Sequence, residues 1–121
     1  MISDRTIREI HDFVIARGWN QYHTPENLAK SISIEAAELL ECYQWIPQSS
    51  SVDEKHVREE LADVLTYCIM MADALDIDLD KIIMNKLAIT KRKYPAEAVR
   101  NNFDEYETRH LNARREKGNT F

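Results

Sequence analysis

The sequence predicts an all-α fold, an oligomeric four-helix bundle with a charged C-terminal extension, and three observations support this. The 121 residues include only 2 Gly and 3 Pro, too few for a fold rich in hairpin turns. Ala, Leu, Ile, Glu and Lys are common, a balance that favours helices. Four segments repeat apolar residues at helical spacing and are joined by short links, as in a helix bundle.

The first two helices are expected before residue 47. Asp4 can cap the first, and Gly18 stops it. Thr24 is the expected N-cap of the second, with Pro25 at its first position, where a missing backbone N–H does no harm. This second helix is expected to end near Trp45.

Two further helices follow a polar loop. The third begins around residues 52–53 and continues to about Leu75. The fourth follows Asp78, a plausible cap, and stops at residues 94–95, where Tyr-Pro disfavours helix. We therefore expect a single helical domain over residues 1–95.

Residues 96–121 are highly charged, with Phe103, Tyr106 and Leu111 as sparse apolar anchors. They form either a fifth helix packed on a partner subunit or a tail. We treat them as a C-terminal extension.

Composition also bounds the partners and the compartment. The formal net charge of -5 argues against non-specific binding to nucleic acid, which depends on neutralising phosphates. No apolar stretch approaches a membrane span, and the N-terminus has no signal-peptide core. Cys42 and Cys68 form no metal-binding spacing and suit a reducing cytosol. We expect a cytoplasmic protein with no membrane and no nucleic-acid partner.

Acidic pairs interrupt two of the apolar helices. Glu35 and Glu38 are three residues apart in the second helix, and Glu60 and Asp63 repeat this spacing in the third. Residues three apart lie one turn above each other on the same side of a helix. Glu35, Glu60 and Asp63 border the apolar stripes of their helices, so antiparallel packing would bring the two pairs to one partly buried place.

Such a group of carboxylates calls for a cation. Acids in a low-dielectric site repel one another and take up protons unless a positive charge compensates them. Oxygen ligands at this density suit Mg²⁺, with Mn²⁺ as a possible substitute. Magnesium commonly shares its coordination with substrate phosphates, so we expect a phosphate-bearing ligand. Either pair alone is more often a solvated helix face.

The sequence also resembles a known family in two long strings. They read "WNQYHTPENLAKSISIEAAELLECYQW" and "EELADVLTYCIMMADALDIDLDKIIMNKLAITKRKYP". In both, the sequence resembles the MazG-like all-α nucleoside triphosphate pyrophosphohydrolases, above all the small single-domain dCTP-pyrophosphatase-like members. The likeness covers about residues 10–98 and keeps the acidic pairs, their interval, the opening Trp-x-Gln-Tyr-His and the closing Lys-Tyr-Pro in order.

The resemblance implies Mg²⁺-dependent cleavage between the α and β phosphates of a nucleoside triphosphate, which gives the monophosphate and pyrophosphate. Its metal ligands would be Glu35, Glu38, Glu60 and Asp63, and Glu38 is our candidate to orient or deprotonate the attacking water. The substrate would be dCTP or another deoxynucleotide, in nucleotide-pool house-cleaning.

Two positions depart from the family pattern. Ile34 stands where the wider family often has an acid, which puts the number of metal ions in doubt. Thr90 stands where related sequences often carry an Asn associated with the nucleotide, so base or sugar selection can differ.

Aromatic and basic residues are further candidates for substrate binding, each with a plainer structural role beside it. His23 precedes the N-terminus of the second helix, where anions are favoured. Trp45 and Trp19 can stack a base, although core packing is the commoner role of a lone Trp. By resemblance, Tyr67 is a nucleotide contact and Lys86 a phosphate contact. Lys91 and Lys93 also suit the end of a helix without any ligand.

Two rival functions are weaker. A di-iron or di-manganese bundle requires two Glu-x-x-His motifs, and the sequence has one, from Glu107 to His110. A non-enzymatic helical interaction module would use the acids as surface charge. Within the enzyme hypothesis, dUTP or a phosphoribosyl nucleotide stays open as the substrate.

Wide apolar arcs predict self-association. The main apolar stripe of the third helix is expected to centre on Leu61, Val64, Leu65, Cys68 and Ala72. Ile69, Met70 and Met71 lie outside this stripe, and a monomer would expose such surface. We expect a homodimer, and the resemblance implies a homotetramer with active sites near the subunit interface.

Overall fold

The computed structural model describes residues 2–47 and 51–118, and all their regular structure is helical. The chain divides into two compact units, one ending at Asp78 and the other beginning at Leu79. The first holds α1 (Asp4–Ala16), the 3-10 helix η1 (Trp19–Gln21), α2 (Pro25–Gln44) and α3 (Glu54–Ala74). The second holds α4 (Leu79–Lys93), α5 (Ala96–Val99) and α6 (Phe103–Gly118). The prediction of an all-α fold is confirmed.

The start of α1 corrects one predicted cap. Ser3, not Asp4, has extended backbone (φ -81°, ψ 157°), and its side chain accepts the backbone N–H of Thr6 at 3.2 Å. Asp4 lies in the first turn, where a carboxylate is favoured by the helix dipole. After α1, Gly18 takes a left-handed conformation with φ 66°, which glycine adopts without strain.

The caps of α2 and α3 agree with the sequence. Thr24 accepts the backbone N–H of Asn27 at 3.2 Å, with Pro25 at the start of α2. Asp53 accepts the backbone N–H of His56 at 3.3 Å, and Leu75 is the C-cap of α3. Each cap satisfies one of the N–H groups that a helix leaves unpaired at its first turn.

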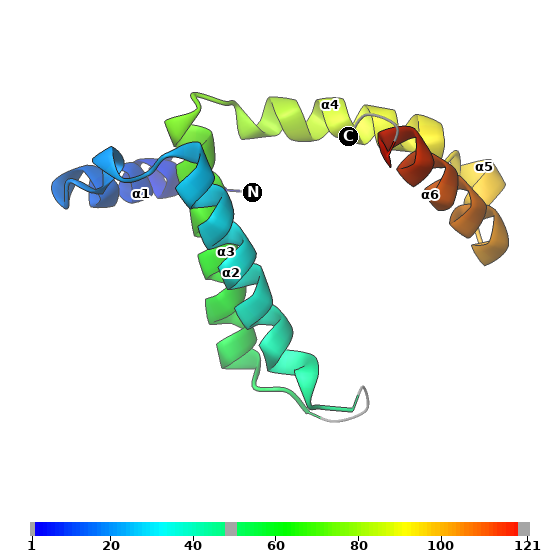
Figure 1. Ribbon diagram of the computed structural model, residues 1–121, viewed down its shortest axis with the longest axis horizontal. Helices are drawn as coiled ribbons and strands as arrows, with labels where there is room; N and C mark the ends of the chain where they lie inside the picture. Colours follow the sequence, from blue (N-terminus) through cyan, green and yellow to red (C-terminus); the bar gives the residue numbers. More distant parts are fainter. Residues whose placement is uncertain (1, 48–50, 119–121) are drawn as a thin grey trace. The chain divides into compact units, whose positions relative to one another are not determined.

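Helices α2 and α3 lie side by side as an antiparallel pair (Figure 1). Leu28 from α2 and Met70 from α3 are buried together with Val14 from α1, so one core cluster joins the three helices. The half-buried residues packed against this cluster are Ile10, Tyr67 and Met71. The core therefore fixes the register of α2 against α3 near the start of α2 and the end of α3.

The buried face of α3 differs from the expected stripe. Ile69 and Met70, which we placed outside the stripe, are only 5% and 8% exposed. Leu61 and Leu65, which we placed at its centre, are 45% and 44% exposed. The reason is that α1 packs on the C-terminal half of α3 and covers a second face there.

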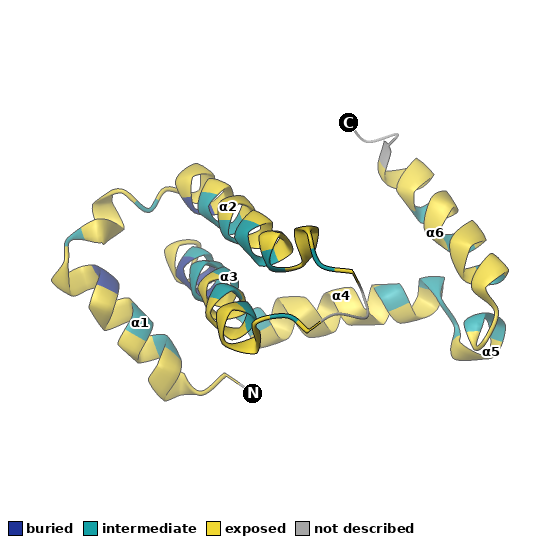
Figure 2. Cartoon of the chain, turned by 90° about the horizontal axis from the view of Figure 1, so that it is seen from below, coloured by how far each residue is buried: buried dark blue, intermediate teal, exposed yellow. Residues whose placement is uncertain are grey.

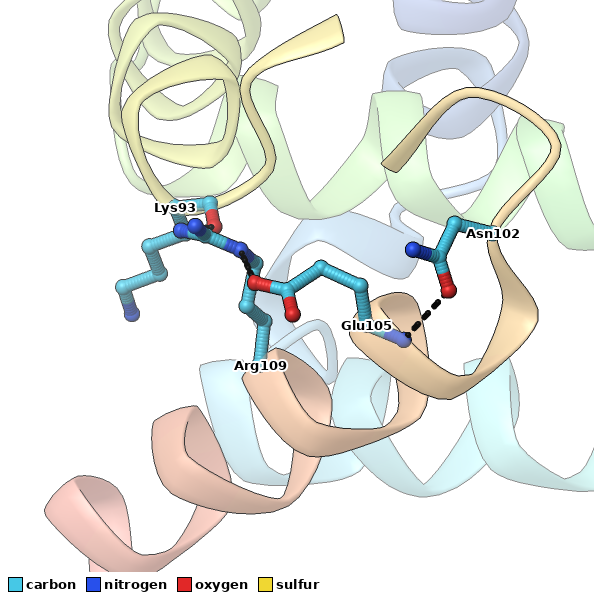
Figure 3. A network of polar contacts seen from close by, with 4 residues as sticks. All are labelled: Lys93, Asn102, Glu105 and Arg109. Atoms are coloured by element: carbon cyan, nitrogen blue, oxygen red, sulfur yellow. Dashed lines mark hydrogen bonds and ion pairs between the residues drawn. The ribbon is translucent and has the colours of Figure 1, made fainter. Parts of the chain in front are cut away.

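The second unit shows that residues 96–118 are helical apart from short links. Arg109 of α6 donates to Glu105 Oε1 at 2.7 Å and to the backbone oxygen of Lys93 at 3.2 Å (Figure 3). Asn102 accepts the backbone N–H of Glu105 at 3.1 Å, which caps the start of α6. The bond from Arg109 to Lys93 ties α6 to the last turn of α4.

Helix α4 carries apolar side chains that the described chain leaves exposed (Figure 2). They are Ile82, Ile83, Met84, Leu87 and Ile89. Over the part of the chain that the structure describes, none of the helices is long and apolar enough to cross a membrane.

The burial of Leu28 leads to a test of the core. Leu28 is 1% exposed, so Leu28→Ala should lower the free energy of unfolding by about 2 to 5 kcal/mol, through lost burial and the cavity left behind. Chemical denaturation at a fixed protein concentration measures this change. Lys30→Ala, at an exposed position of the same helix, is the control and should change stability by less than about 0.5 kcal/mol. Equal effects of the two substitutions would contradict the assigned core.

Candidate functional site

The register of the α2 and α3 pair brings acidic residues opposite each other. Leu28 and Met70 share the core cluster. Glu38 lies ten residues after Leu28 on α2, and Glu60 lies ten residues before Met70 on α3. Because antiparallel helices advance equally from a shared contact, Glu38 and Glu60 reach the same level. Glu35 is one turn before Glu38 and on the same side of α2.

The carboxylates of Glu35, Glu38 and Glu60 form one cluster. One oxygen of each lies within 4.8 Å of the others, and all three side chains are half-buried. Asp63, the fourth predicted ligand, is exposed and stands outside this group of three, but its charge acts on Glu35 and Glu60. The structure thus brings together three of the four acids, with Asp63 at their border.

The electrostatics of the cluster are those of unpaired like charges. Burial raises the pKa of Glu35 from 4.5 to about 7, assisted by the hydrogen bond with Glu38 and by repulsion from the neighbouring carboxylates. Burial and Glu38 also raise the pKa of Glu60. Glu38 contributes to both shifts, which agrees with its place close to both of the other acids.

Two oxygens of the cluster have no hydrogen-bond partner among the residues that the structure describes. Oε2 of Glu35 and Oε2 of Glu60 are buried without a hydrogen bond, and a buried polar atom in this condition destabilises the fold. A cation between the helices would satisfy both oxygens and offset the repulsion. An all-oxygen set of carboxylates fits a hard ion such as Mg²⁺ or Mn²⁺ far better than zinc.

Two neighbours of the cluster were not among the residues singled out from the sequence. Nε2 of His56 lies 3.8 Å from Oε1 of Glu60, and the spacing of four residues on one helix could have indicated this pair. The thiol of Cys42 donates to the backbone oxygen of Glu38 at 3.6 Å. Burial and the nearby Glu60 raise the pKa of Cys42, so this thiol stays protonated beside the acids.

The predicted aromatic contacts lie at different levels of the first unit. Trp45 is the C-cap of α2 and is 84% exposed. Trp19 packs edge-on against Phe13, with ring centroids 5.4 Å apart. Tyr67 packs against the core cluster. His23 is half-buried in the turn before α2, and its backbone N–H donates to the oxygen of Asn20 at 3.4 Å.

The predicted basic contacts and one departure from the family pattern belong to the second unit. Lys86, Lys91 and Lys93 all lie on α4. The hydroxyl of Thr90 donates to the backbone oxygen of Lys86 at 3.1 Å, so it bonds to its own helix. The other departure, Ile34 on α2, is 57% exposed and offers no oxygen to a metal.

Comparison with known proteins shows the family. A model described as the MazG-like family matches residues 30–108, a range that contains all four predicted metal ligands. The chain belongs to the MazG-like family.

Relatives of this MazG-like chain include dCTP pyrophosphatase 1 from Homo sapiens, 36% identical over 108 residues, and from Bos taurus, 32% identical over 108 residues. Each match covers 83% of this chain and 64% of the relative, so the chain spans less than two thirds of their length. A crystal structure of a pyrophosphatase from Archaeoglobus fulgidus DSM 4304 is similar, with a TM-score of 0.68 and 40% identity. The structural match covers 76% of this chain and 91% of the Archaeoglobus fulgidus chain. The likeness supports the helical architecture described above.

The repulsion at Glu35 predicts opposite effects of one substitution with and without metal. In metal-free protein, Glu35→Gln removes a buried charge and should raise the midpoint of thermal unfolding by a few degrees at pH 8. With saturating Mg²⁺ the wild type should gain stability by ligand binding, and the variant should gain much less. Glu41→Gln, at an exposed position of the same helix, should behave as the wild type. A variant that is less stable without metal would contradict the assigned repulsion.

The pKa of Glu35 also predicts how stability depends on pH. Because its pKa is 4.5 ordinarily and about 7 in the folded protein, the folded state holds this proton more tightly than the unfolded state. The free energy of unfolding should therefore fall as pH rises from about 4.5 to 7 in metal-free protein. Denaturation at several pH values in EDTA measures this slope, which should be shallower in Glu35→Gln. Equal slopes would contradict the assignment.

Proposed function

We propose that this chain is a Mg²⁺-dependent nucleoside triphosphate pyrophosphohydrolase that gives the nucleoside monophosphate and pyrophosphate. The observation that carries this proposal is the pair of buried, unpartnered oxygens of Glu35 and Glu60 in a cluster of three acids. Membership in the MazG-like family and the name of the dCTP pyrophosphatase relatives support it. dCTP, or another deoxynucleoside triphosphate, is the first substrate to test, with house-cleaning of the nucleotide pool as the biological role.

The acids have distinct tasks in this reaction. Glu35, Glu38 and Glu60 would hold the metal, and Asp63, which is exposed at their border, would be the fourth ligand. When bound, the metal neutralises phosphate charge and stabilises the pyrophosphate leaving group. Glu38 lies close to both other acids and would orient or deprotonate the water that attacks the phosphorus atom.

Further residues would bind the nucleotide. Trp45 exposes 84% of its surface at the end of α2, and a base stacked on its ring would cover an otherwise wet aromatic face. Trp19, Tyr67 and His23 are further candidates for the base and sugar. On α4, the ammonium groups of Lys86, Lys91 and Lys93 would bind phosphate oxygens.

Product analysis tests the reaction directly. Incubated with Mg²⁺ and each common nucleoside triphosphate in turn, including dUTP, the protein should release pyrophosphate and monophosphate without orthophosphate. Glu38→Gln should lower kcat at least a hundredfold, because both a metal ligand and the water-orienting group are lost. Glu41→Gln is the matched control and should keep wild-type activity. The ranking of rates identifies the base and sugar.

Other products would point elsewhere. Release of nucleoside diphosphate and orthophosphate would show cleavage between the β and γ phosphates and would contradict the proposed reaction. No turnover of any triphosphate would favour the alternative function, a non-enzymatic helical module with a carboxylate-rich surface.

The exposed apolar residues of α4 support a proposed assembly. We infer a homodimer or homotetramer in which copies of the chain complete a four-helix bundle over residues 1–95. Residues 96–121 would act as an extension packed on a partner subunit. The free thiols Cys42 and Cys68 suit a cytoplasmic location, and the acidic net charge disfavours a nucleic-acid partner.

Sedimentation at micromolar concentration tests the assembly. The wild type should sediment as about two or four copies of the 14.2 kDa chain. Ile83→Glu, which adds a charge to a 58% exposed apolar position, should weaken association at least tenfold. Asn20→Glu adds the same charge at an exposed polar position outside α4 and serves as control. A wild type that sediments as a monomer would contradict the assembly.

A further inference from the structure

We propose that His56 is a positioning residue that orients the carboxylate of Glu60 toward the metal. The inference rests on the proposed metal site and adds a residue that neither the acidic pairs nor the family resemblance pointed to. In the structure, the two oxygens of Glu60 have different surroundings.

The two oxygens of Glu60 face opposite environments. Oε1 lies 3.8 Å from Nε2 of His56. Oε2 is buried and has no hydrogen-bond partner, and the Glu60 side chain is only 13% exposed. One oxygen thus meets a potential donor at the edge of the site, and the other is left for a ligand inside it.

The backbone of His56 is itself fixed. Asp53 caps α3 by accepting the backbone N–H of His56 at 3.3 Å, so this cap anchors the turn that carries the imidazole. Glu60 follows four residues later, the spacing at which helical side chains meet. The Asp53 cap thus fixes the backbone of His56, and the imidazole of His56 in turn lies next to Glu60 of the cluster.

Other basic residues of this turn point to other acids. Lys55 Nζ lies 3.9 Å from Oε1 of Glu59, and Arg58 lies 3.5 Å from Oε2 of Glu54. These pairs are well exposed, and surface pairs of this kind contribute little to stability. The contact of His56 with the half-buried Glu60 differs from them because it reaches the cluster itself.

Orientation of a ligand matters because the terminal torsion of a glutamate rotates freely. Partners outside the coordination sphere commonly fix metal-binding carboxylates, and their loss weakens metal binding by about 10- to 100-fold. The distance of 3.8 Å is longer than a hydrogen bond, but contacts at a site often tighten when its ligand binds. With Oε1 held by His56, the buried Oε2 would stay available to the metal.

Calorimetric titration with Mg²⁺ of the full chain tests this role. His56→Leu should weaken Mg²⁺ binding about tenfold, because the donor is lost. His56→Gln keeps an N–H donor of similar reach and should bind within about twofold of the wild type. Leucine and glutamine are both neutral and have similar helix propensities, so their difference reports the donor alone. Lys55→Gln, one residue away, should bind as the wild type does.

A second readout excludes general damage to the fold. In the pyrophosphohydrolase assay, His56→Leu should need about tenfold more Mg²⁺ for half-maximal rate and keep its kcat at saturating Mg²⁺. A structural defect would lower kcat at every Mg²⁺ concentration, and that result would overturn the proposal. Equal Mg²⁺ affinity in wild type and His56→Leu would also overturn it and leave the proposed function standing. A wild type that binds no Mg²⁺ would overturn both.

Discussion

The repulsion among three half-buried carboxylates is the constraint on which the rest of this structure depends. Glu35, Glu38 and Glu60 would separate if α2 and α3 were free to move, because like charges in a partly buried site favour separation or protonation. The apolar contact of Leu28 with Met70, ten residues away on each helix, holds the helices in register. The core thus keeps the acids together against their own electrostatics.

The site and the core lie at different levels of the same helix pair for a physical reason. Around Leu28, α1 adds a third helix, and Val14 completes a buried cluster. Nearer the start of α3, Leu61 and Leu65 are exposed, so the helices pack less completely in that region. This second region can hold charged groups and admit a ligand, while the fully packed region supplies stability.

Much of this fold follows from local sequence signals. Thr24, Pro25 and Asp53 define where α2 and α3 begin, because capping depends only on residues within one turn. Ser3 and Asp4 are residue types with similar preference for the N-cap, so this preference alone does not decide which of the two neighbours caps α1. The burial of Met70 with Val14 depends on α1, which lies far away in sequence, so the periodicity of α3 alone placed its core face incorrectly.

The candidate site, like the fold, is predictable from the sequence where it depends on local spacing within one helix. The spacing of three residues indicates that Glu35 and Glu38 face one way, but their meeting with Glu60 depends on the helix register. His56 belongs neither to the acidic pairs nor to the motifs of the family resemblance, so neither of them predicted it. The pKa of Glu35 is raised by desolvation and by repulsion from the neighbouring acids. An uncharged residue at position 35 would remove both effects. In the metal-free fold an ionised Glu35 would oppose folding above about pH 7, and the proposed metal would offset this cost.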